Sequence, residues 1–111
     1  MLFTAIVLFA LAAVLGILIL KNWLTSSNTP RTVIYVHGLF AAIAVLLLLI
    51  QVIRHPNTAL RTSFVFFAAA AAGGLYMFFR DRKGKFSPTW LAVAHGLIAV
   101  TGFVFLLLNV L

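Results

Sequence analysis

The sequence of 111 residues has no cysteine, so this chain by itself forms no disulfide and offers no thiolate to a metal ion or an iron–sulfur cluster. Asp81, the only acidic residue, lies in the basic segment RDRKGK. Paired-carboxylate catalysis and a carboxylate proton relay within an apolar helix are therefore excluded. No Ser/His/Asp set, phosphate loop or zinc signature occurs either. These common catalytic sets of a stand-alone enzyme are therefore missing.

Charge is scarce, because 8% of the residues are charged and 65% are hydrophobic. Soluble domains have about 45–50% apolar residues. Four segments without Asp, Glu, Lys or Arg approach or exceed the roughly 18–20 residues that cross the hydrocarbon core of a bilayer. Helices satisfy every backbone amide in lipid, and the alternation typical of barrel strands is missing. We therefore predict an all-α integral membrane protein, a single domain over 1–111 with four transmembrane helices at about 2–20, 33–53, 62–79 and 90–111.

The basic residues are distributed unevenly among the connections. Loops 21–32 and 80–89 hold most of them, whereas loop 54–61 contains only Arg54 and Arg61. Basic loops stay in the cytoplasm, so we expect a cell (inner) membrane protein with both termini on the outer or periplasmic side. The net charge of +7 then serves topology and contact with anionic lipid headgroups, and no nucleic-acid partner is expected.

The two halves of the chain resemble each other. A shift of 58 positions aligns 30–53 with 88–111 without a gap. Proline, histidine and glycine rarely coincide by chance in apolar segments, so we predict two tandem helical hairpins, repeat 1 in 1–53 and repeat 2 in 59–111. Parallel repeats place their equivalent residues at one depth, about 9–10 Å inside the cytoplasmic helix ends for the histidines. The matches include Pro30/Pro88, His37/His95, Gly38/Gly96, Leu39/Leu97 and Ala41/Ala99.

The paired histidines are the candidate site. An ionisable side chain in hydrocarbon is costly, and it usually faces the bundle interior with a partner or ligand. A metal ion alone would ordinarily need three or four protein ligands, and the spans add only Met77 as a further soft donor. Haem supplies four equatorial nitrogens and needs only two axial ligands. We therefore predict haem b between the second and fourth helices, with His37 and His95 as the metal ligands.

Small residues adjoin each histidine and would leave room for the edge of the macrocycle. Arg31 lies near the cytoplasmic end, where its guanidinium would pair with a propionate. The predicted cofactor-binding residues are His37, His95, Gly38, Ala41, Gly96, Ala99 and Arg31.

This arrangement is similar to that of four-helix b-type membrane cytochromes, which implies electron transfer with a quinone or a partner redox protein. One haem near one face does not carry electrons across the bilayer, so we expect other membrane subunits or a homo-oligomer. An electron-transfer or accessory subunit is therefore favoured over a stand-alone enzyme.

The alternative is a non-catalytic accessory or assembly subunit of a larger membrane complex, in which the histidines form structural interhelical hydrogen bonds. Ala12/Gly16 and Ala70/Gly74 are small-residue pairs with no histidine near them in the sequence. We interpret them as sites of close helix packing. His55, in the short loop RHPN, is expected to be solvated.

Overall fold

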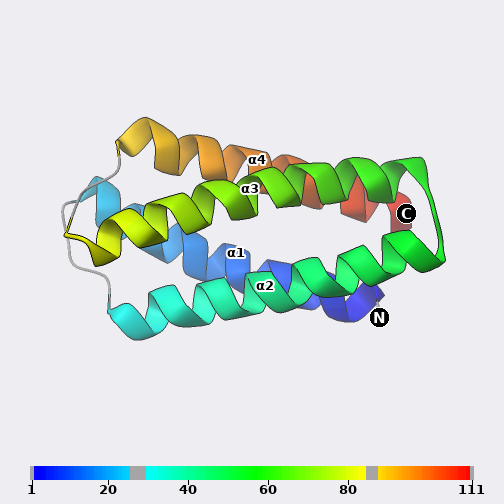
Figure 1. Ribbon diagram of the computed structural model, residues 1–111, viewed down its shortest axis with the longest axis horizontal. Coiled ribbons are helices and arrows are strands. Elements are labelled where there is room, and N and C mark those ends of the chain that lie inside the picture. The colour runs from blue at the N-terminus through cyan, green and yellow to red at the C-terminus, as the bar shows by residue number, and fades with distance from the viewer. Residues whose placement is uncertain (1, 26–29, 85–87, 111) are drawn as a thin grey trace.

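The computed structural model describes residues 2–25, 30–84 and 88–110, and they form an up-and-down bundle of four helices (Figure 1). The helices are α1 (Leu2–Leu24), α2 (Arg31–Arg54), α3 (Thr58–Arg82) and α4 (Thr89–Val110). No strand occurs in these ranges, and each helix is long and apolar enough to cross a membrane. The all-helical prediction with four helices is confirmed.

The helices extend beyond the apolar segments that predicted them. α3 begins at Thr58 because the Asn57 side chain accepts hydrogen bonds from the backbone N–H groups of Ala59, at 2.8 Å, and Leu60, at 3.4 Å. At its other end α3 continues to Arg82, where cationic side chains interact favourably with the helix dipole. The length of an apolar segment therefore predicts the part of a helix that lipid can surround. It does not predict the residues at which the helix begins and ends.

Pro30 and Pro88 each stand immediately before a helix. The Pro30 carbonyl accepts a hydrogen bond from the Val33 N–H at 3.1 Å, and the Pro88 carbonyl accepts one from the Leu91 N–H at 3.0 Å. α2 and α4 consequently start in the same way, with a proline whose missing N–H costs no intrahelical bond.

The helices pack as two hairpins. α1 packs mainly against α2 and α3 mainly against α4, with fewer contacts between α2 and α3 and between α1 and α4. Across the diagonals, α1–α3 and α2–α4, no Cα atoms of the described residues come within 8 Å. Any contact between diagonal helices across the centre of the bundle is therefore made by side chains.

The buried core lies in the half of the bundle nearer the termini, and its members recur at one spacing. Ser63, which is fully buried, donates a hydrogen bond to the Gly102 carbonyl at 2.8 Å and so joins α3 to α4. The corresponding positions of the first hairpin hold Ala5 and Ala44, both fully buried. The buried residues separated by 58 positions are Ala5 and Ser63, Phe9 and Phe67, Ala12 and Ala70, Ala44 and Gly102, and Leu48 and Leu106.

The two ends of the bundle differ in charge. The start of α1, the end of α4 and the short α2–α3 connection lie at one end, and the last turns of α1 and α3 and the first turns of α2 and α4 lie at the opposite end (Figure 1). The first end carries Arg54 and Arg61. The second end carries Lys21, Arg31, Arg80, Arg82 and Lys83. Lys85 is outside the described residues.

Candidate cofactor site

A cavity of about 730 Å³ lies between the four helices. Phe9, Phe67 and Phe103 line it beside the core, whereas Arg31 and Asp81 line it toward the basic end of the bundle. Its walls are otherwise mostly alanine, glycine and aliphatic side chains. Its volume falls within the about 300–1,000 Å³ that is typical of cofactor and ligand pockets.

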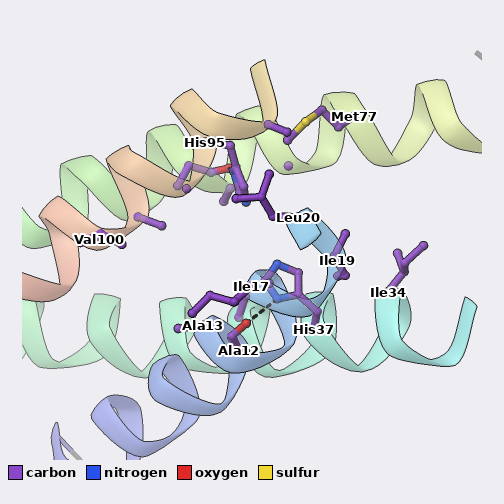
Figure 2. A pocket seen from close by; sticks show the side chains of 18 of the residues that line it. Ala12, Ala13, Ile17, Ile19, Leu20, Ile34, His37, Met77, His95 and Val100 are labelled. Carbon is purple, nitrogen blue, oxygen red and sulfur yellow. Dashed lines mark hydrogen bonds between the residues drawn. The ribbon is translucent and has the colours of Figure 1, made fainter. Parts of the chain in front are cut away.

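His37 and His95 project into this cavity from opposite helices, α2 and α4. Their ring centroids are 6.5 Å apart and their planes are inclined by 77°. Figure 2 shows the two imidazoles facing one another across the space. Two helices that do not touch through their backbones thus present one titratable side chain each to a common centre.

One nitrogen of each ring is held by the neighbouring helix of the same hairpin. The His37 Nδ1 lies 2.7 Å from the Ala12 carbonyl oxygen (Figure 2), and the His95 Nδ1 lies 2.8 Å from that of Ala70. A carbonyl oxygen only accepts, so each Nδ1 carries the hydrogen and donates it. The Nε2 of each neutral ring then keeps its lone pair and is available as an acceptor or a metal ligand.

Glycines make these hydrogen bonds possible. Gly16 and Gly74 follow the accepting alanines by one helical turn. A Cβ atom on Gly16 would stand 3.0 Å from the His37 Cε1, and a Cβ on Gly74 would stand 3.0 Å from the His95 Cε1. Such a contact is tighter than van der Waals distance, so any other residue at either position would press on the ring.

The interpretation of the pairs Ala12/Gly16 and Ala70/Gly74 as sites of close helix packing alone missed their contact with the histidines. His37 and His95 reach these pairs from the adjacent helix, because an antiparallel neighbour places distant sequence positions side by side. The alanine carbonyls accept the imidazole hydrogen bonds, and the glycines leave room for the rings. The recurrence of both pairs at the same spacing as the histidines is the sequence signal that could have indicated this role.

Six of the seven predicted site residues line the cavity, and Gly38 does not. Gly38 is exposed and does not belong to the residues that line the cavity, and a Cβ added to it would have no atom within 4 Å. Ala44 and Gly102, on the same helices, are buried in the core and do not line the cavity. The predicted residues that do line it are Arg31, His37, Ala41, His95, Gly96 and Ala99.

The described residues include no group of three or more His, Asp or Glu side chains that would hold a metal ion. His55 is exposed at the end of α2, where its N–H bonds to the Gln51 carbonyl at 2.8 Å, remote from the cavity. Within the described residues, the cavity is thus lined by two imidazoles, those of His37 and His95, and by no third histidine.

Comparison of the chain with protein-family models, curated proteins and solved structures found no match.

Proposed function

We propose that this protein is a membrane b-type cytochrome subunit that binds one haem between α2 and α4 through the Nε2 atoms of His37 and His95. The observation that carries the proposal is the facing pair of imidazoles, each with its Nδ1–H donated to a backbone carbonyl. Metal-binding histidines characteristically donate their second nitrogen to a carbonyl or carboxylate, which fixes both the tautomer and the ring orientation.

The separation of the rings matches axial ligation. A metal–imidazole bond is about 2.0–2.1 Å and the ring centre lies roughly 1.1 Å behind the nitrogen, so two imidazoles on opposite sides of one metal have centres roughly 6.3 Å apart. The observed separation is 6.5 Å. A ring separation of this size supports the ligation of one iron by both side chains.

The rest of the cavity suits an amphipathic, flat group. The small residues Ala41, Gly96 and Ala99 leave space beside the histidines. The phenylalanine side chains line the end of the cavity next to the core. Arg31 lines the cavity toward the basic end, where a propionate would meet a cationic guanidinium. Haem bound here would supply one-electron chemistry, and two axial histidines would leave the iron no open position for a substrate.

The membrane setting belongs to the same proposal. The outer faces of all four helices expose large apolar side chains, such as Phe3, Leu39, Leu75 and Leu97, which lipid would cover. The charge asymmetry of the bundle supports basic connections in the cytoplasm and termini on the outer side of the cell (inner) membrane. The recurrence of buried residues and of both histidine contacts at 58 positions supports duplication of a helical hairpin.

Electron transfer in this protein requires a partner. The histidines lie within two turns of the basic end, so one haem reaches only one side of the bilayer efficiently. The subunit therefore exchanges electrons with a quinone or a partner redox protein, as part of a larger membrane complex or a homo-oligomer.

The reduced-minus-oxidised visible absorption spectrum of the purified protein tests this function. The wild type should show a Soret band that shifts on reduction, and His37→Ala and His95→Ala should each lose it. His55→Ala is the matched control, because this histidine is exposed and remote from the cavity, and it should keep the wild-type spectrum. A colourless, folded wild-type protein would contradict the proposal.

The same hydrogen bonds also support a second function, that of a non-catalytic accessory or assembly subunit. Each histidine joins the two helices of its own hairpin without any ligand, and interhelical hydrogen bonds in membranes contribute about 0.6 kcal/mol on average. In that case His37→Ala would weaken the bundle and the association with partner subunits, and no preparation would absorb visible light.

A further inference from the structure

The planes of the two imidazoles are nearly perpendicular, and the residues beside each ring are known from the structure. Each ring is bound at its Nδ1 by a carbonyl of the neighbouring helix, and its Cε1 edge lies where a Cβ on the glycine one turn later would stand only 3.0 Å away. The hydrogen bond limits where the ring points, and the missing side chain of the glycine leaves the space in which the ring takes this orientation. The resulting angle between the planes is 77°.

We propose that Gly16 and Gly74 are positioning residues that hold the two axial imidazoles in crossed planes and thereby set the electronic state of the bound iron. This inference rests on the proposed haem function and adds to it the residues that control the geometry of the ligands. Neither glycine touches the iron. Each acts through the ring that lies against it.

Crossed planes have a specific electronic consequence. An imidazole donates π density into the iron d orbital that lies perpendicular to its ring. Two parallel rings raise the same orbital and separate it from its partner, whereas two crossed rings raise both orbitals almost equally. A ferric iron whose two orbitals have nearly the same energy gives a strongly anisotropic electron paramagnetic resonance (EPR) signal. Its oxidised state also lacks the stabilisation that two orbitals of different energy would provide. Ligand orientation is thus one of the means by which a protein tunes a haem.

A single methyl group at either glycine should disturb this arrangement. The added Cβ would stand 3.0 Å from the Cε1 of the facing ring, so that ring must turn or withdraw from its carbonyl. Because 77° is already close to perpendicular, most such movements bring the planes nearer to parallel. Alanine is also a better helix former than glycine, so the helix itself is not weakened.

The chain provides a matched control. A Cβ added to Gly38, next to His37, would have nothing within 4 Å, and Gly38 does not line the cavity. Gly38→Ala therefore makes the same chemical change beside His37 without pressing on a ring.

The test is low-temperature EPR of the ferric, haem-loaded protein, with the midpoint potential measured on the same samples. The wild type should give the low-field, strongly anisotropic signal of crossed ligands. Gly16→Ala and Gly74→Ala should each shift this feature toward a rhombic signal and lower the potential, while Gly38→Ala should match the wild type.

A rhombic wild-type signal overturns the inference, as do Gly16→Ala and Gly74→Ala signals identical to that of a crossed wild type. Should a variant fail to fold, as judged by circular dichroism, the wild-type signal and the other glycine variant still decide. Absence of haem from the wild type would contradict the proposed function itself, which distinguishes that failure from failure of the positioning role.

Discussion

Phe9 and Phe67 stack face to face, with ring centroids 3.8 Å apart and planes within 5° of parallel. They belong to α1 and α3, which lie across a diagonal of the bundle. In the described residues, no Cα atoms of these two helices come within 8 Å of each other. The stack separates the packed core from the cavity that holds the histidines. It joins the two hairpins across the bundle.

Phe67→Ala should lower the free energy of unfolding by about 3 kcal/mol, near the lower end of the range for buried phenylalanine, because both the stack and the cavity floor are lost. Unfolding in mixed detergent micelles measures this change. Phe3→Ala is the control, since the Phe3 side chain is 72% exposed. Equal destabilisation by the two variants would show that the stack does not join the hairpins.

Ser63→Ala should cost little, about 0.6 kcal/mol, although Ser63 is fully buried and bonds across helices to Gly102. The corresponding position of the first hairpin holds Ala5, which is equally buried without a hydroxyl. The same unfolding assay applies. Thr101→Ala is the control, because its hydroxyl bonds only within α4, to the Leu97 carbonyl. A loss above about 2 kcal/mol would contradict the view that packing dominates here.

Arg31→Gln should weaken haem binding by at most about fivefold, the equivalent of about 1 kcal/mol for an exposed ion pair. Arg31 lines the cavity near its basic end but is itself exposed. Competition with an excess of an apo haem protein measures the affinity. Arg54→Gln, at the opposite end of the bundle, should leave the affinity unchanged. An identical affinity for both variants would place the propionates elsewhere.

Much of the fold was predictable because lipid imposes a simple rule, in which an uncharged apolar segment of sufficient length becomes a helix. The helix ends were not predictable from that rule. Asn57 starts α3 through its side chain, and this capping lies outside any measure of apolar length.

The candidate site was predictable in part. The matching positions of His37 and His95 indicated a shared site, and the structure brings the two side chains to one cavity. Their partners were missed, because Ala12 and Gly16 lie on another helix and only the packing register of α1 against α2 reveals the contact. Gly38 was placed on the wrong side for the same reason: spacing along one helix defines a face but not the direction in which that face points.

We propose that His37 and His95 ligate one iron together. Near-infrared magnetic circular dichroism of the ferric protein tests this ligation, because the energy of the ligand-to-iron charge-transfer band depends on the identity of both axial ligands. We expect the band of low-spin haem with two neutral imidazoles in the wild type, and its replacement by the band of another ligation state in a haem-reconstituted His95→Ala variant. A wild-type spectrum of high-spin or mixed-ligand haem, or a purified protein that takes up no haem, would contradict it.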